Sequence, residues 1–344
     1  MSSHLIKQRN DMHQNKMYTI QILRGIAALS VVFSHSSHKL AQTKLFTSDF
    51  FSFAGFGVDI FFMISGFIMM FITGVDAKDN KNRNILSFFK DRIIRIIPLY
   101  WFFTILSLAI FCIMPGSINS SGGDTGILQS FILLPVPNGT KFLIQNGWTL
   151  TYEFLFYFAF SFFLVRTDRE KLIFVLLTFL AIDVSSSFFG LQSFASYSIK
   201  YEFILGIGLY LFFKKDYLYA VLAFLLAYSI AFFNTGLGGR VLNEGLHAFI
   251  LVLMFLVVEN KFSWKGPVSL FLLFLGDISF SLYLSHPFVI QGISILNSHL
   301  SLNVYVVFVL MVLCSIIFGY LIYTLLEKKM VSFFKNKKLK KVTV

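Results

Sequence analysis

The sequence predicts an all-α protein, a polytopic membrane bundle of about ten transmembrane helices. The first observation is composition: 56% of the 344 residues are hydrophobic and only 13% are charged. A soluble chain of this length needs far more charge to cover its surface. The second observation is that long apolar runs alternate with short polar segments along the chain. The third is the one-sided distribution of basic residues, which predicts the orientation of the bundle.

Ten apolar runs are interpreted as spans, although several of the middle ones are short for the roughly 20 residues that cross a bilayer. The spans cover residues 18–38, 53–74, 97–115, 147–165, 171–189, 200–213, 217–234, 245–259, 269–291 and 303–326. Together they form one transmembrane domain, 18–326. We expect a cytoplasmic segment before it, over 1–17, and a basic cytoplasmic tail after it, over 327–344.

Lysines and arginines gather on one side of this arrangement. All but five of the 29 lie in the N-terminal segment, in or next to every second loop, or in the tail. The five on the opposite side are Lys39, Lys44, Lys141, Lys200 and Arg240. Because positive loops stay in the cytoplasm, both termini are predicted to be cytoplasmic, which requires an even number of spans. The net charge of +12 therefore reflects topology and contact with the lipid bilayer, and no nucleic-acid partner is expected.

The first span carries the most informative pair, Arg24 and His35. Eleven residues at 100° each make three turns plus 20°, so both side chains lie on nearly one face, about 16 Å apart along the axis. An ionisable residue inside a membrane helix is costly and therefore points to function. A cation near the cytoplasmic surface with a titratable base three turns deeper suits a long anionic donor. The alternative for His35 is a packing histidine that bonds to a neighbouring helix.

Three carboxylates lie at the same depth as His35. Asp59 in span two, Glu153 in span four and Glu202 in span six all sit about 18–24 Å from the inner surface, counted at 1.5 Å per residue. Burying four ionisable groups separately against lipid is costly, so we expect one shared polar cavity in the outer half of the bilayer. Asp59 is also a candidate to orient the His35 imidazole and support its positive charge. Alternatively, each carboxylate reaches interfacial water at a helix end.

Before span three, Arg92 and Arg95 are three residues apart and share a helix face just cytoplasmic of the membrane. Two guanidinium groups there suit phosphate recognition, because each can make bidentate hydrogen bonds. An interfacial helix whose arginines touch lipid phosphates is the alternative. After this span, the segment 116–146 is rich in Gly, Ser, Asn and Pro and is predicted to be an irregular extracytoplasmic loop.

In span nine, His286 precedes Pro287, where a helix kink can expose backbone carbonyls. His286 is interpreted either as a substrate-binding residue or as a packing histidine. Glu202, Trp148 and Tyr152 complete the set of candidate substrate-binding residues.

The chain resembles the acyltransferase 3 family of bacterial membrane acyltransferases. Five stretches appear in the family's order over roughly residues 20–290: LRGIAALSVVFSH, FGVDIFFMISGFIM, RIIRIIPLYW, WTLTYEFLFY and ISFSLYLSHPF. The family's Arg/Lys-x10-His motif falls on Arg24 and His35, and its Arg-x-x-Arg motif on Arg92 and Arg95. The resemblance implies an enzyme of the bacterial cytoplasmic (inner) membrane that acylates cell-envelope carbohydrates, usually with acetyl-CoA as donor. Among members, the chain is most similar to those that act on exopolysaccharide or O-antigen.

Resemblance and spacing together predict an O-acetyltransferase in which the three arginines bind the phosphates of acetyl-CoA. His35 either removes the proton of a sugar hydroxyl as it attacks the thioester or becomes transiently acylated. Asp59 and Glu153 are the candidate catalytic carboxylates. Cys112 and Cys314 both fall in apolar segments, so no disulfide framework and no metal site are expected. Expected partners are the carbohydrate acceptor and proteins of polysaccharide biosynthesis.

The sequence is also compatible with two other functional classes of protein. Ten spans with intramembrane carboxylates also suit a proton-coupled transporter or flippase for a polysaccharide precursor. Against it, the sequence has no paired halves with matching Gly- or Pro-interrupted helices, and its arginines cluster on one face. A non-catalytic component of a polysaccharide synthesis complex would leave His35 without a role.

Overall fold

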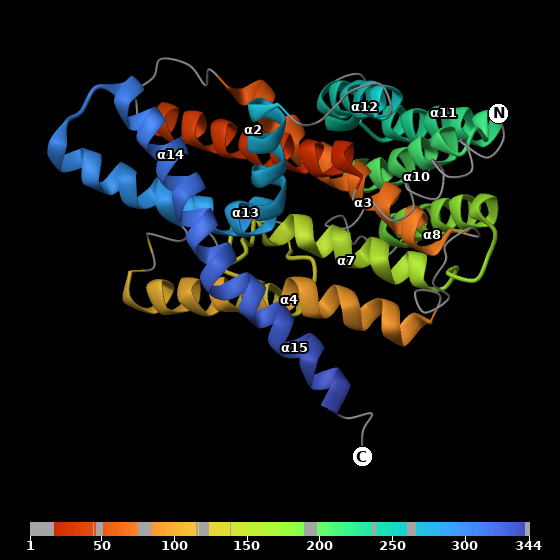
Figure 1. The fold of residues 1–344 in the computed structure, drawn as a ribbon, viewed down its shortest axis with the longest axis horizontal. Helices are drawn as coiled ribbons and strands as arrows, with labels where there is room; N and C mark the ends of the chain where they lie inside the picture. Colours follow the sequence, from red (N-terminus) through yellow and green to blue (C-terminus); the bar gives the residue numbers. More distant parts are fainter. Residues whose placement is uncertain are drawn as a thin grey trace.

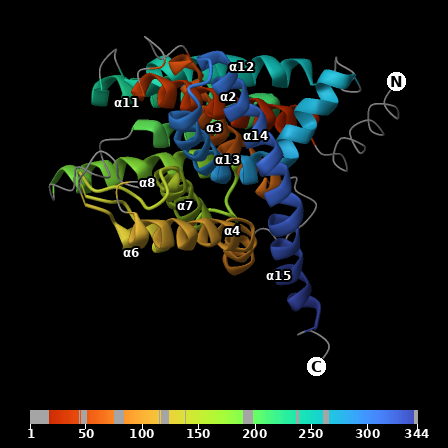
Figure 2. The same ribbon diagram turned by 90° about the vertical axis from the view of Figure 1, so that its left-hand side faces the viewer.

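A computed structural model of the protein describes residues 17–43, 45, 51–74, 84–114, 116, 124–137, 139–188, 198–235, 239–259 and 266–340. In these ranges the ordered elements are helical, apart from an isolated bridge between Thr125 and Lys141. The helices pack side by side into one bundle (Figure 1, Figure 2). Of the two predicted terminal segments, 1–16 and 341–344 lie outside the described residues.

The predicted spans all fall on helices. The helical elements are α2 (Tyr18–Gln42), η1 (Ser52–Phe56), α3 (Gly57–Thr73), α4 (Ile85–Ile113), α6 (Ile127–Ile132), α7 (Gly147–Ser161), α8 (Asp168–Phe188), η3 (Ser198–Lys200), α10 (Tyr201–Phe213), α11 (Tyr217–Thr235), α12 (Arg240–Val258), α13 (Pro267–Leu300), α14 (Val304–Ile322), η4 (Tyr323–Glu327) and α15 (Lys328–Lys340). Among the described residues, five stretches are long and apolar enough to cross a membrane: Ala54–Thr73, Ile85–Ile113, Arg240–Val258, Pro267–Leu300 and Val304–Lys335. The predicted fold class, a polytopic helical membrane protein, is confirmed.

Several helices are longer than the predicted spans, and two of them, α4 and the C-terminal rod, extend the furthest. α4 begins at Ile85, so Arg92 and Arg95 lie in the same continuous helix as the apolar span. The side chain of Asn84 caps this helix by accepting from the backbone N–H of Ser87 at 3.2 Å. At the other end of the chain, α14, η4 and α15 form one rod that extends beyond the bundle (Figure 1). Charged residues such as Lys and Arg are good helix formers, so a count of apolar residues finds only part of each helix.

α2 and α13 approach each other closely through two glycines. A Cβ atom at Gly25 would lie 2.4 Å from the carbonyl oxygen of Leu272, and one at Gly276 would lie 2.0 Å from that of Gln21. Only glycine permits such an approach of two helix backbones. Next to this contact, Nε2 of Gln21 donates to Oδ1 of Asp277 at 2.7 Å. The two helices are therefore held in a defined register.

Contacts between helix ends agree with the predicted alternation of the spans. On the predicted cytoplasmic side, the backbone N–H of Thr19 donates to Oε2 of Glu259 at 3.1 Å, which joins the start of α2 to the end of α12. On the opposite side, Lys200 forms an ion pair with Asp183, which joins the start of α10 to the end of α8. Each contact joins two ends that the charge distribution places on the same side.

The described part of segment 116–146 is more regular than the predicted irregular loop. It contains α6 and packs on α4 through two aromatic donors. The hydroxyl of Tyr100 donates to the carbonyl of Ser130 at 2.7 Å, and Nε1 of Trp101 donates to that of Phe131 at 2.9 Å. Donors from another helix satisfy these loop carbonyls, and the Gly and Ser content of the loop does not predict such contacts.

Candidate functional site

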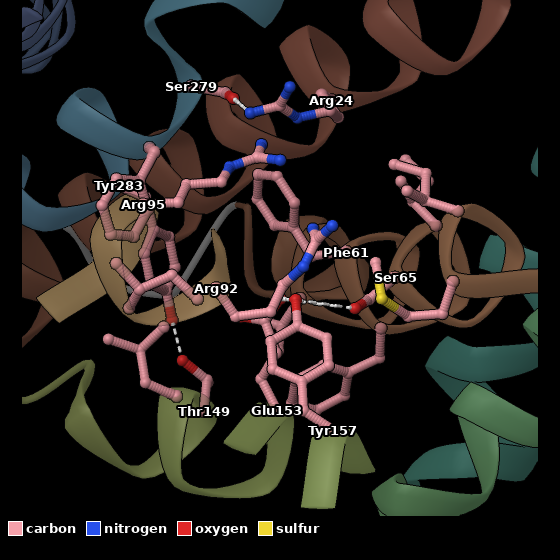
Figure 3. Close-up of a pocket in the computed structure, with 18 residues that line it drawn as sticks. Arg24, Phe61, Ser65, Arg92, Arg95, Thr149, Glu153, Tyr157, Ser279 and Tyr283 are labelled. Atoms are coloured by element: carbon pink, nitrogen blue, oxygen red, sulfur yellow. Dashed lines mark hydrogen bonds between the residues drawn. The ribbon is translucent and has the colours of Figure 1, made fainter. Parts of the chain in front are cut away.

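A cavity opens between α2, α3, α4, α7 and α13. Its empty volume is about 780 Å³, open solvent at its mouth included. Apolar side chains, most of them from α3, form much of its wall. Its polar lining consists of Arg24, Ser65, Arg92, Arg95, Thr149, Glu153, Tyr157, Ser279 and Tyr283 (Figure 3).

Arg24 enters this cavity from α2. Its Nη2 donates to Oγ of Ser279 at 2.9 Å, and its Nη1 donates to Oε1 of Gln21 at 3.2 Å. Both partners are neutral, so they orient the guanidinium without cancelling its charge. The close packing of α2 on α13 brings Ser279 within reach of Arg24.

Arg92 and Arg95 enter the cavity from α4, opposite the α2 arginine (Figure 3). The guanidinium carbon of Arg92 lies 5.7 Å from the ring centroid of Phe88 and 5.9 Å from that of Tyr157, at cation–π distance. The Nε of Arg92 is buried and has no hydrogen-bond partner among the described residues. Within the same part of the chain, none of the three arginines forms an ion pair with a carboxylate. Their charges thus remain available to an anion.

Glu153 faces the same cavity from α7. Its Oε1 accepts from the hydroxyl of Tyr157, one turn later on the same helix, and from Oγ of Ser65 at 3.3 Å. Arg92 is close enough for Coulombic attraction to this carboxylate. The cavity therefore combines cations that suit an anionic ligand with a fixed carboxylate that can accept a hydrogen bond from a hydroxyl.

Tyr283 connects this cavity to the turn of α13 that contains the proline. Its hydroxyl lies 2.6 Å from Oγ1 of Thr149, which joins α13 to α7. Pro287 has no N–H and cannot donate to the backbone carbonyl of Tyr283, four residues earlier. Nδ2 of Asn146 donates to that carbonyl instead, at 2.5 Å. The carbonyl that Pro287 leaves available thus anchors the start of α7.

The two histidines singled out in the sequence meet beside Tyr283. Nε2 of His286 lies 3.0 Å from Nδ1 of His35, and their ring centroids are 4.9 Å apart. The ring of Tyr283 lies 6.1 Å from that of His286. His286 is completely buried, whereas His35 is partly exposed. The histidine pair therefore neighbours the cavity through Tyr283.

Asp59 has a different partner from the predicted one. Arg240 donates to both of its carboxylate oxygens, from Nη2 at 2.6 Å and from Nε at 3.2 Å, and also donates to the carbonyl of Gly55 at 2.9 Å. Asp59 is completely buried, and the Arg240 side chain is 36% exposed. Glu202 is also completely buried and interacts electrostatically with Asp59. The prediction that Asp59 orients His35 is corrected by this geometry.

The four ionisable groups predicted at one depth do not share one cavity. Glu153 lines the cavity, and His35 lies in the histidine pair. Asp59 and Glu202 lie in the first turns of α3 and α10, beside the arginine that begins α12. The rise per residue determines how deep a side chain lies, but the direction in which it points depends on how each helix is turned about its axis.

Trp148 and Tyr152 lie on α7 with their ring centroids 6.3 Å apart. Tyr152 is buried and Trp148 is partly buried against the apolar core, and the described lining of the cavity includes neither. Their assignment to substrate binding stays a prediction, as do those of Glu202 and His286.

Five hydroxyl side chains of the cavity were not singled out in the sequence. They are Ser65, Thr149, Tyr157, Ser279 and Tyr283. Among them, Tyr157 has a clear signal, because it follows Glu153 by four residues and therefore shares its helix face. The other four are ordinary residues of apolar helices, and no spacing distinguishes them.

Comparison with known proteins agrees with this picture. A family model described as an acyltransferase domain matches residues 17–324, a range that contains the cavity and both histidines. The chain is 30% identical over 300 residues to the "Exopolysaccharide production protein ExoZ" of Rhizobium meliloti (strain 1021), which covers 82% of this chain and 91% of that protein. No solved structure matches the chain. The resemblance in the five motifs is thereby confirmed, and this multi-pass membrane protein belongs to the acyltransferase 3 family.

Proposed function

We propose that this chain is a membrane O-acetyltransferase that moves an acetyl group from cytoplasmic acetyl-CoA to a hydroxyl of a cell-envelope carbohydrate, such as an exopolysaccharide or O-antigen. One observation carries the proposal: three guanidinium groups from two helices converge on a single cavity that also contains a hydrogen-bonded carboxylate. The cavity thus offers binding groups for a polyphosphate ligand and for a hydroxyl within one acyltransferase domain.

The arginines suit the phosphate groups of coenzyme A. Guanidinium groups bind phosphate oxygens through paired hydrogen bonds, and Arg24 approaches from α2 while Arg92 and Arg95 approach from α4. The buried Nε of Arg92 is a donor without a protein partner in the described residues, which fits an anionic ligand at this place. The extended arm of the donor can then follow the cavity toward Tyr283, which borders the histidine pair.

His35 is the candidate general base at the reacting end. It takes the hydrogen of the acceptor hydroxyl while the hydroxyl oxygen bonds to the thioester carbonyl carbon. The carbon–sulfur bond then breaks, and the same proton passes from His35 to the departing thiolate. The products are an acetyl ester and free coenzyme A, with no proton or electron left over. In the alternative order, the acetyl group first resides on His35. Glu153 is the candidate to bind the acceptor hydroxyl.

A carbohydrate acceptor is supported by the printed name of the relative, which refers to exopolysaccharide production. The charge distribution predicts that the arginines lie on the cytoplasmic side, where acetyl-CoA is found. The acceptor then enters from the outer side of a bacterial inner membrane, brought there by other proteins of polysaccharide biosynthesis.

The proposal is tested with purified protein in detergent and with acetyl-CoA labelled in the acetyl group. We expect hydrolysis or exchange of acetyl-CoA by the protein alone, and label transfer to envelope glycan from cells that lack the protein. His35→Ala should reduce both rates by about 10²–10⁴, the usual contribution of a general base. Mass spectrometry of envelope glycans with and without the protein identifies the acetylated sugar. If the protein leaves acetyl-CoA intact but moves glycan across the membrane of proteoliposomes, the proposal is wrong and the protein is a transporter.

A further inference from the structure

His286 has no part in the reaction as described, yet both nitrogens of its buried ring have partners. Nδ1 lies 3.1 Å from the backbone carbonyl oxygen of Leu282, and Nε2 lies 3.0 Å from Nδ1 of His35. The side chain is completely buried. A buried polar ring normally has both nitrogens hydrogen-bonded, so these two contacts determine where the proton of the His286 ring lies and which atom it offers to Nδ1 of His35.

The protons can be assigned step by step from the Leu282 carbonyl. A carbonyl oxygen only accepts, so Nδ1 of His286 carries the proton of that ring. The ring is neutral, because burial penalises a charged imidazole and no carboxylate bonds to His286 in the described part of the chain. Its Nε2 therefore has a lone pair, which accepts from Nδ1 of His35. It follows that neutral His35 has its own lone pair on Nε2.

We propose that His286 is a positioning residue that holds His35 in the tautomer whose Nε2 is the base. The proposal rests on the proposed function, because that function gives His35 its role as base. A neutral imidazole takes the place that a carboxylate occupies in a Ser–His–Asp arrangement. When Nε2 of His35 receives the hydroxyl proton, the bond from its Nδ1 to His286 keeps the ring in place until the proton passes to the thiolate.

The backbone around His286 is held independently of its ring. Asn146 binds the Tyr283 carbonyl, one turn before the histidine, and the packing of Gly25 against α13 fixes the neighbouring helix. A change of the side chain at position 286 can therefore remove one hydrogen bond without removing the contacts that define the backbone.

Glutamine and asparagine at this position form a matched pair. The carbonyl oxygen of glutamine reaches about as far as Nε2 and can accept from His35, whereas that of asparagine reaches only as far as Nδ1. We expect His286→Gln to keep kcat within about fivefold of wild type and His286→Asn to lose roughly 10- to 100-fold, part of a general base's usual contribution. KM for acetyl-CoA should change by less than about threefold in both, because the phosphates bind elsewhere. Equal kcat values for the two variants would overturn the proposal.

Two further variants separate this proposal from the proposed function. If His35→Ala keeps full activity, the role of His35 as base fails, and that of His286 fails with it. If His35→Ala is inactive while the Asn and Gln variants are equally active, only the positioning role fails. His38→Gln is the matched control, since His38 is an exposed histidine three residues after His35, beside Gln42 at 2.9 Å, and both constants should stay unchanged.

Folding is checked by the melting temperature and the membrane abundance of each variant. If His286→Asn does not accumulate, His286→Leu takes its place, because leucine fills the buried site and offers no acceptor. A leucine variant with the kcat of the glutamine variant overturns the proposal, and one at least about tenfold slower supports it.

Discussion

Nη2 of Arg24 donates to the hydroxyl of Ser279 at 2.9 Å, so a neutral residue of α13 orients a cation of α2. We expect Ser279→Ala to raise KM for acetyl-CoA about tenfold or more at unchanged kcat, because a hydrogen bond to a charged group contributes roughly 1.5–3 kcal/mol. Steady-state kinetics at saturating acceptor measure the effect. Ser298→Ala is the control, since that hydroxyl is exposed and bonds to its own helix. A fall in kcat alone would contradict the prediction.

Arg92→Ala and Arg95→Ala should each weaken binding of coenzyme A more than they slow saturated turnover, because the phosphates lie far from the reacting carbonyl. Charge-assisted hydrogen bonds contribute about 1.5–3 kcal/mol, which corresponds to roughly a 10- to 150-fold rise in Kd. Isothermal titration calorimetry with coenzyme A gives the values. Arg169→Ala should leave Kd unchanged, because this exposed arginine is paired with Asp216 at 2.7 Å. An unchanged affinity in the double variant would indicate arginines that contact lipid instead.

Asp59→Asn and Arg240→Gln should each lower the melting temperature more than they change kcat of the folded protein. Each substitution removes the charged partner of the other group at a buried position, which is more destabilising than loss of an exposed pair. The double variant should lose less stability than the sum of the single changes. Thermal unfolding in detergent measures all three, with Asp216→Asn as the exposed-pair control. If Asp59→Asn has the melting temperature of wild type but no turnover, the prediction is wrong and Asp59 takes part in the reaction.

Gly276→Ala should reduce both folded yield and affinity for acetyl-CoA. The added methyl group would lie 2.0 Å from the carbonyl oxygen of Gln21, so α2 and α13 must move apart, and the contact between Arg24 and Ser279 is lost with them. Gly292→Ala on the same helix meets no atom within 4 Å and should be neutral or stabilising by up to about 1 kcal/mol, the difference in helix propensity. Melting temperature and KM of the two variants provide the comparison. Equal behaviour would show that the helices can separate without consequence.

Donor and acceptor should reach the protein from opposite sides of the membrane. In a background without Cys112 and Cys314, we expect Lys90→Cys to react with an impermeant thiol reagent only in inverted vesicles and to be protected by acetyl-CoA. Asp124→Cys should react in intact spheroplasts and be protected by acceptor glycan. Both positions are exposed, on α4 and in the segment before α6. Labelling of both from the same side would overturn the predicted topology.

Much of the fold could be predicted because hydrophobic runs determine where helices lie. The start of α4 could not, since its early turns carry Lys, Asp and Arg, which an apolar count excludes although Lys and Arg favour a helix. The regular structure in the described part of segment 116–146 could not be predicted either, because it depends on hydrogen-bond donors from another helix, such as the hydroxyl of Tyr100.

In the candidate site, the sequence predicts which side chains share a face of one helix. It does not predict which side chains of different helices come into contact. The shared face of Arg24 and His35 follows from helix pitch alone. The contact of His35 with His286 joins residues 251 positions apart, and nothing in the local pattern of either segment specifies it. The same holds for Asp59, whose partner Arg240 was assigned only to the outer side of the membrane, by its charge.

The ion pair between Asp59 and Arg240 also has a consequence for biogenesis. In the predicted topology, Arg240 begins α12 on the outer side and has to be translocated during synthesis, and a charged residue is costly to move through a bilayer. Asp59 precedes it by 181 residues and is therefore synthesised first. The acid is thus available as a partner for the arginine when α12 inserts. We therefore expect insertion of α12 to depend on prior integration of α3.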